Sequence, residues 1–111
     1  MNALGTVEKP IVFTSMDDPE YNGGIGNFAR QWGGIKINST GTFNGDNIKL
    51  RNACAIAKRE SNILVYGKLN LLNSEIKKGY SAGIYFDTDI SPILKFNIFS
   101  QNYYGVYNER S

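Results

Sequence analysis

The feature that most constrains this chain is a self-similarity at a spacing of 22 residues near its C-terminal end. An offset of 22 places aliphatic residues on aliphatic residues and glycine on glycine: Leu71 on Ile93, Leu72 on Leu94, Ile76 on Ile98, Gly83 on Gly105 and Ile84 on Val106. A repeat of this length suits a unit of two or three short strands joined by tight bends, each strand pairing with its equivalent in the next turn. The repeat therefore predicts a solenoid with parallel stacking.

Looser copies of the same unit precede these two. Residues 48–52 lead to Ala55-Ile56-Ala57, and Ile35 lies 21 residues before Ile56. We expect Ile35, Ile56 and Ile84 to occupy one inner column. The spacing from Ile56 to Ile84 is 28, so one turn should hold about six extra residues, which we place within residues 59–68.

Alternation along each copy predicts strands rather than helices. Pairs of apolar residues two apart should face inward: Ile35 and Ile37, Ile48 and Leu50, Ile84 and Phe86, Phe96 and Ile98. The residues between them, such as Lys36 and Tyr85, should face outward. Asparagine and glycine tolerate left-handed backbone and suit the bends, where Asn52, Asn73 and Asn102 are predicted to form a partial ladder. An antiparallel sandwich is the alternative, but it would not require equivalent residues at a fixed spacing.

Two segments resemble a recurrent stretch of bacterial surface proteins with right-handed parallel β-helix repeats. They are Gly5-Thr6-Val7-Glu8-Lys9-Pro10-Ile11-Val12-Phe13-Thr14-Ser15 and Trp32-Gly33-Gly34-Ile35. The two C-terminal turns resemble generic repeats of the same pectate-lyase-like superfamily. The resemblance implies an all-β, right-handed, single-stranded parallel β-helix of about four turns over residues 1–111, with a polar insertion at about 16–31. It also implies an extracellular or cell-surface location.

Complete β-helices of this superfamily are closed by a capping element at each end, and the sequence offers no amphipathic helix for that task. We therefore expect the chain to be a fragment, or its exposed ends to associate end to end with another copy.

Charge and hydropathy exclude several classes of partner. The formal net charge is +2, from 12 Lys and Arg against 10 Asp and Glu spread along the whole length, so no basic stripe is present to neutralise phosphates. No apolar run approaches the length of a membrane span. We expect neither a nucleic-acid partner nor a membrane span.

Candidate ligand-binding residues lie on the outward rows of the predicted stack. Tyr85 and Tyr107 fall on one outer row, and Arg59, Asp87 and Glu109 fall on a row two positions later. Tyrosine rings offer surface on which the apolar faces of sugars stack, and neighbouring carboxylates are the groups that glycosidases use. The plainer interpretation is that these charges solvate the sheet and that the tyrosines cover its edges or contact another chain.

A polar insertion supplies the one candidate metal site. Asp17, Asp18 and Glu20 place three carboxylates in one loop, and Ca²⁺ prefers six to eight oxygen ligands of this kind. The loop lacks the spaced Asp-x-Asp-x-Asp pattern of an EF-hand, so a solvated polar loop is the alternative.

The absence of histidine excludes Ser-His-Asp and Cys-His catalytic arrangements. We therefore predict a non-enzymatic structural or carbohydrate-binding β-helix module with a polysaccharide or glycan as its partner. The alternative is a fragment of a polysaccharide lyase or glycoside hydrolase, in which Asp87 and Arg59 would act on the substrate.

Overall fold

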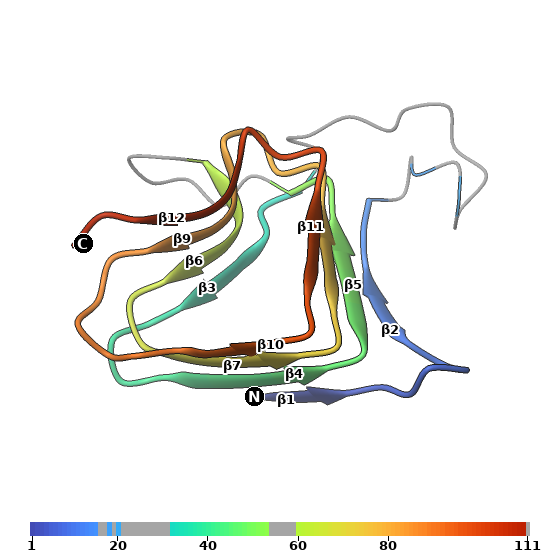
Figure 1. Ribbon diagram of the computed structural model, residues 1–111, viewed down its shortest axis with the longest axis horizontal. Coiled ribbons are helices and arrows are strands. Elements are labelled where there is room, and N and C mark those ends of the chain that lie inside the picture. Colours follow the sequence, from blue (N-terminus) through green and yellow to red (C-terminus); the bar gives the residue numbers. More distant parts are fainter. Residues whose placement is uncertain (16–17, 19, 21–31, 54–59, 111) are drawn as a thin grey trace.

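The computed structural model describes residues 1–15, 18, 20, 32–53 and 60–110. Within these residues twelve short strands wind around a triangular prism (Figure 1). In chain order they are β1 (Asn2–Leu4), β2 (Ile11–Phe13), β3 (Ile35–Ile37), β4 (Thr42–Asp46), β5 (Ile48–Arg51), β6 (Ser61–Val65), β7 (Lys68–Leu72), β8 (Glu75–Lys77), β9 (Ala82–Phe86), β10 (Ile93–Lys95), β11 (Ile98–Ser100) and β12 (Tyr104–Asn108).

Each turn of the chain adds one strand to each of three sheets. The first sheet has the order β1-β4-β7-β10, the second β11-β8-β5-β2 and the third β12-β9-β6-β3. Every pairing between these strands is parallel. The shortest dimension of the molecule, 21 Å, fits four turns stacked at about 4.8 Å. The predicted all-β parallel β-helix of about four turns is confirmed.

The core is a set of aliphatic columns that run through the centre of the prism. On the first sheet Leu71 lies between Gly45 and Leu94, and on the second sheet Ile76 lies between Leu50 and Phe99. The most deeply buried members come from the two middle turns: Leu50, Ile63, Val65, Leu69, Leu71, Ile76 and Ile84. These side chains are buried because the turns above and below them cover both sides of each column.

Left-handed backbone turns the chain at the corners. Asn47, Asn52 and Asn73 have φ angles of 51°, 66° and 52°, as their residue type predicts. The predicted ladder of Asn52, Asn73 and Asn102 is wrong. Asn73 lies at a corner between the first and second sheets, whereas Asn52 and Asn102 lie at corners between the second and third sheets, two turns apart. An asparagine ladder forms instead on the outer face of the first sheet, where hydrogen bonds join Asn2 to Asn44 (2.8 Å) and Asn44 to Asn70 (2.7 Å).

The predicted register holds on one sheet and is off by one residue on the other two. Val106 lies opposite Ile84 as expected, but Leu94 lies opposite Leu71, and Phe99 opposite Ile76, an offset of 23. The corner between β8 and β9 has four residues, whereas the corner between β11 and β12 has three, so the offset changes at that corner alone.

This shift reverses the predicted orientation of β10 and β11 in the last turn, while β12 keeps the predicted one. Phe96 and Ile98 were expected inside, but they are 83% and 62% exposed. Phe99, which an offset of 22 would turn outward, packs against the core.

The third column contains a second correction. Ile35 pairs with Ile63, not with Ile56, and Ile63 pairs in turn with Ile84. The extra residues therefore lie between Arg51 and Ser61 rather than within 59–68. Residues 55–57 lie outside the described part of the chain.

Candidate functional site

A groove of about 600 Å³ opens where the third sheet turns into the first. The corner between β6 and β7 has only two residues, Tyr66 and Gly67, while the corners before and after it in the stack span 38–41 and 87–92. The short corner is recessed between the two longer ones, which form the walls. Since those walls are two turns apart, the groove is about 10 Å across at backbone level.

Gly67 allows this recess to form. A Cβ atom at this position would clash with the carbonyl oxygens of Asn38 and Gly41. The flanking residues hold the two corners together, because Tyr66 N donates to Ile37 O at 2.8 Å and Lys68 N donates to Gly41 O at 3.0 Å. The tight approach of two backbones thus fixes the floor of the groove.

Charged side chains line the groove in pairs. Arg110 lies 2.9 Å from Asp87 through Nε and 3.0 Å from Asp89 through Nη1. The hydrogen bond to Asp87 and the charge of Asp89 raise the pKa of Arg110 above its usual value. On the opposite wall the ammonium of Lys36 lies 5.6 Å from the centre of the Tyr66 ring, within cation–π range.

Tyrosines cluster on the outer face of the third sheet beside the groove. Tyr85 and Tyr107 are stacked, with ring centres 5.8 Å apart and planes 6° apart. Tyr104 meets Tyr107 edge to face at 5.2 Å, and Tyr103 meets Tyr104 in the same way at 4.8 Å. The rings form a continuous aromatic surface that leads from the third sheet to the last corner.

Within this cluster only part of the aromatic surface meets solvent. Tyr85 is 2% exposed, so its ring is a support for the others, whereas Tyr107 is half-buried and Tyr103 is exposed. Burial, followed by a hydrogen bond to the Glu109 side chain, raises the pKa of Tyr85 to about 12. Its hydroxyl group therefore stays protonated at neutral pH.

The structure brings together three of the four predicted ligand-binding residues. Tyr85, Tyr107 and Asp87 lie on neighbouring strands and corners of the third sheet. Arg59 lies outside the described residues. The sequence alignment predicted that Arg59 lies beside Asp87 in the neighbouring turn. Tyr66 takes this position, because Val65 pairs with Phe86.

Of the residues that line the groove, sequence reasoning predicted only Asp87 as a site residue and missed the others, among them Lys36, Tyr66, Asp89 and Arg110. A signal for Tyr66 was present. Residues 63–66 have an apolar pattern similar to that of residues 84–87, with Ile63 at the position of Ile84. An alignment of these two segments places Tyr66 beside Asp87.

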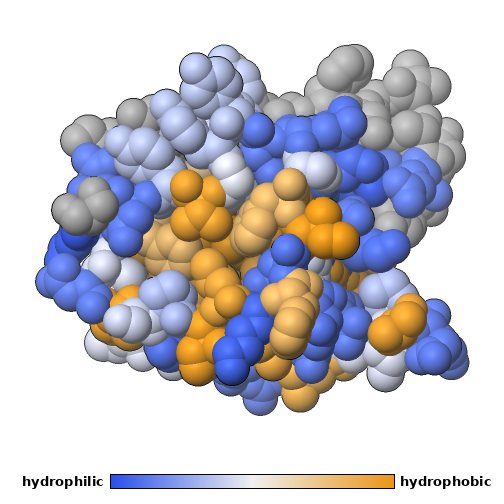
Figure 2. Space-filling view, in the orientation of Figure 1, coloured by the Kyte–Doolittle hydropathy of each residue, from blue (hydrophilic) through white to orange (hydrophobic). Residues whose placement is uncertain are grey.

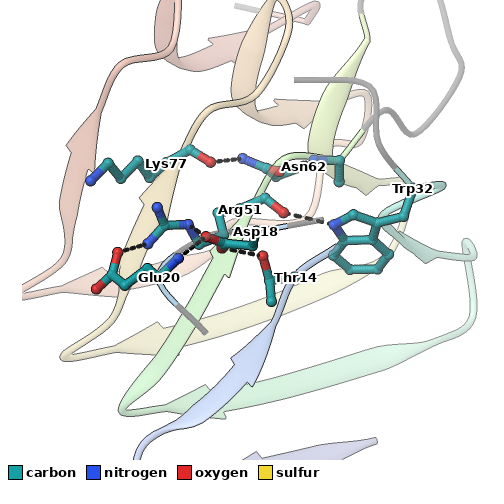
Figure 3. A network of polar contacts seen from close by, with 8 residues as sticks. Thr14, Asp18, Glu20, Trp32, Arg51, Asn62 and Lys77 are labelled. Carbon is teal, nitrogen blue, oxygen red and sulfur yellow. Dashed lines mark hydrogen bonds and ion pairs between the residues drawn. The ribbon is translucent and has the colours of Figure 1, made fainter. Parts of the chain in front are cut away.

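Two of the three predicted metal ligands, Asp18 and Glu20, form ion pairs with an arginine (Figure 3). Arg51 is buried on the outer face of the second sheet, with Nε 2.9 Å from Asp18 Oδ2 and Nη1 2.6 Å from Glu20 Oε2. Asp18 is also buried, and it accepts hydrogen bonds from Thr14 Oγ1 at 2.6 Å and Glu20 N at 3.0 Å. A guanidinium thus supplies the positive charge that these carboxylates need.

Asp17 lies outside the described residues, so calcium binding at this loop stays a prediction. In the part of the chain that the structure describes, no group of three or more Asp, Glu, Cys or His side chains is arranged to hold a metal ion.

Further hydrogen bonds near Arg51 join neighbouring segments of the solenoid. Trp32 Nε1 donates to the carbonyl of Arg51 at 2.7 Å, and Asn62 bridges two turns by accepting from Ala53 N and donating to Lys77 O. Figure 3 shows the contact of Trp32 with Arg51 and that of Asn62 with Lys77. The contacts of Arg51 thus join chain segments that are far apart in the sequence.

Comparison of the chain with protein-family models, with curated proteins and with solved structures finds no match. Among the described residues, no helix has the length and apolar character needed to cross a membrane.

Proposed function

We propose that this protein is a carbohydrate-binding module without a catalytic centre of its own, and that the groove above Tyr66 and Gly67 binds one glycan chain. The observation that supports this is the composition of the groove. It combines an aromatic ring with two carboxylates and a guanidinium in a recess of about 600 Å³, a size common among ligand sites.

These groups match the chemistry of a sugar. Each hydroxyl of a sugar both donates and accepts, so it can donate to Asp87 or Asp89 and accept from Arg110. The ring faces are apolar and can stack on an aromatic side chain such as Tyr66, which lines the groove. The ion pairs of Arg110 bring Asp87 and Asp89 together at one wall of the groove.

The charge balance of the groove favours a neutral glycan. Lys36 and Arg110 contribute two positive charges, and Asp87 and Asp89 contribute two negative charges. A uronate polymer would need an excess of positive charge to offset its carboxylates. The proposed ligand is therefore a neutral polysaccharide rather than a pectin or an alginate.

Kinship with the pectate-lyase-like β-helix superfamily and an extracellular or cell-surface location belong to this proposal. Both rest on the sequence resemblance described above. A glycan-binding role is consistent with that location, because polysaccharides are abundant outside cells.

The proposal is tested by electrophoresis of the protein in gels that contain neutral polymers, such as β-glucans and xylan, or acidic ones, such as pectin, alginate and heparin. We expect retardation by at least one neutral polymer. The variant Arg110→Gln should weaken that binding about tenfold, the effect of losing one hydrogen bond to a charged group. Lys95→Gln, an exposed change on β10 away from the groove, is the matched control.

Two results would contradict the proposal. One is equal retardation of the wild type and Arg110→Gln in every gel. The other is an unsaturated product from an acidic polymer, detected by ultraviolet absorbance, or new reducing ends from a neutral one. If such product were lost in Asp87→Ala with folding intact, the chain would be a lyase or a hydrolase instead.

Association of copies through the ends of the solenoid is the second property that we propose. Of the ten large apolar side chains that are exposed in the described residues, eight lie in the first or the last turn: Met1, Leu4, Val7, Ile93, Phe96, Ile98, Tyr103 and Val106. Figure 2, which looks onto one end of the solenoid, shows apolar atoms gathered across its middle. Exposed apolar surface of this kind favours contact with another surface of the same kind.

A further inference from the structure

We propose that copies of this chain join head to tail, with the fourth turn of one copy stacked on the first turn of the next. This polarity presupposes the end-to-end association already proposed. The head-to-tail arrangement specifies which end of one copy contacts which end of the next, and in what strand register.

One inner column on each sheet continues across such a junction in apolar residues, whereas the second column of the third sheet, Ile37, Val65 and Phe86, ends in the polar Asn108. Each of the three continuing columns ends in an apolar residue at both ends of the solenoid: Ala3 and Leu94 on the first sheet, Phe13 and Phe99 on the second, Ile35 and Val106 on the third. Stacking the fourth turn on a first turn therefore places Leu94 against Ala3, Phe99 against Phe13 and Val106 against Ile35. Apolar surface at the open end, including the 41% exposed Val106, becomes buried.

The backbone edges match in direction as well. Among the described strands, β1, β2 and β3 pair on one side only, and so do β10, β11 and β12. Since all strands of the prism run parallel, a head-to-tail copy presents each edge strand with a parallel partner of its own sheet.

Contact between two identical ends lacks this match. A two-fold axis would lay the second sheet of one copy over the third sheet of the other. The three-residue β11 would then run antiparallel to the five-residue β12, so the parallel order of the sheets would end at the junction and the lengths of the facing strands would not match.

The unusual corner at Phe96 has a role in this junction. Asn47 and Asn73 occupy the equivalent corners of the second and third turns, while Phe96 adopts φ 59°, a conformation that is costly for a bulky residue. The isolated chain does not bury its side chain. Gly5 is the equivalent corner of the first turn, since its N–H donates to Asp46 O, so a following copy would bring the exposed Val7 beside Phe96.

Head-to-tail contact is heterologous and leaves one free end of each kind, so it extends into filaments rather than closing as a dimer. We therefore expect the mass of the wild-type protein in sedimentation experiments to rise with concentration beyond that of a dimer.

The polarity is tested with one blocked end at a time. Val106→Lys places a charge on the last turn, and Ile35→Lys places one on the first turn. A charge in a desolvated apolar junction should weaken association at least about tenfold. Each variant alone should then be monomeric, whereas a mixture of the two should form a dimer, because each retains the end that the other lacks.

Tyr80→Lys, on the side of the third turn, is the matched control and should associate as the wild type does. Circular dichroism and thermal unfolding establish that every variant is folded, and Leu94→Lys and Ile11→Lys replace any variant that is not. If Ile35→Lys dimerises alone, identical ends meet, so the head-to-tail polarity is wrong while end association stands. If the wild type is monomeric at every concentration, both proposals are wrong.

Discussion

Arg51 is a single residue that binds two carboxylates of the polar insertion. Its position on β5 alternates with inward residues, so its side chain leaves the core and would ordinarily be solvated. Here it is buried, because Asp18 and Glu20 from the polar insertion cover it and supply its counter-charges. A buried charge is costly unless it is paired, so the arginine and the two carboxylates depend on each other.

We expect Arg51→Met to lower the free energy of unfolding by about 3 kcal/mol or more, because Asp18 would stay buried without its partner. Chemical denaturation measures this change. The double variant Arg51→Met, Asp18→Asn should recover much of the loss, and Lys49→Met on the same strand should change stability by no more than about 0.5 kcal/mol. A loss for Lys49→Met equal to that for Arg51→Met would show that the ion pair is not responsible.

The raised pKa of Tyr85 predicts that the stability of the folded protein depends on pH in the alkaline range. Its pKa is raised to about 12 in the folded protein, against 10.0 for an unperturbed tyrosine. Between these values the folded state holds a proton that the unfolded state has lost, so its stabilising contribution is complete below pH 10 and is lost as the pH rises toward 12.

The denaturant midpoint of the wild type should therefore fall across this range, and that fall should be smaller in Tyr85→Phe. Tyr80→Phe, at an exposed ring, is the control. Equal pH profiles for the wild type and Tyr85→Phe would rule out this assignment.

At the scale of the elements, the lengths of the corners shape the surface while the strands stay alike. The strands repeat with little change from turn to turn, but the corner between the third and first sheets has four, two and six residues in successive turns. This variation produces the groove. A solenoid can vary its corners freely because insertions there do not disturb the stacked columns.

We expect Gly67→Ala to destabilise the protein by about 1–3 kcal/mol, because its Cβ would meet backbone oxygens that cannot move aside without shifting a whole corner. The variant should also lose glycan affinity, since the floor of the groove is displaced. Gly33→Ala is a matched control, because no atom lies within 4 Å of the Cβ it would add. Similar thermal midpoints for the two variants would contradict this explanation of the groove.

At the scale of the whole molecule, each turn contacts only its neighbours, so stability should vary along the stack. Leu71 in the third turn is covered on both sides and is fully buried, whereas Leu94 in the fourth turn is covered on one side and is partly exposed. The middle of a stack is stabilised by two interfaces and each end by one.

Leu71→Ala should accordingly cost about 2–5 kcal/mol and Leu94→Ala less than about 2 kcal/mol. Amide hydrogen exchange, measured at a concentration where the protein is monomeric, should show slower exchange in β5, β7 and β8 than in β1 and β10. Uniform protection in all four turns would contradict a stack that is stabilised turn by turn.

The sequence by itself determined the architecture, because a β-helix is a repeat and a repeat is visible as periodic aliphatic residues. It also determined the use of asparagine at several corners and the pairing of Ile84 with Val106. These features depend on local backbone preferences and on spacing along the chain, and both can be derived from the amino-acid sequence.

Only the tertiary structure decided the register of the last turn, the partner of Ile35 and the composition of the groove. The corner between β11 and β12 is one residue shorter than the corner between β8 and β9, so Ile98 faces outward and Phe99 inward. The length of a corner is known only when the neighbouring strands have been paired. The partnership of Arg51 with Asp18 is likewise a contact between segments 33 positions apart. The physical reason is common to all of these: side chains from successive turns become neighbours only when the coil is closed.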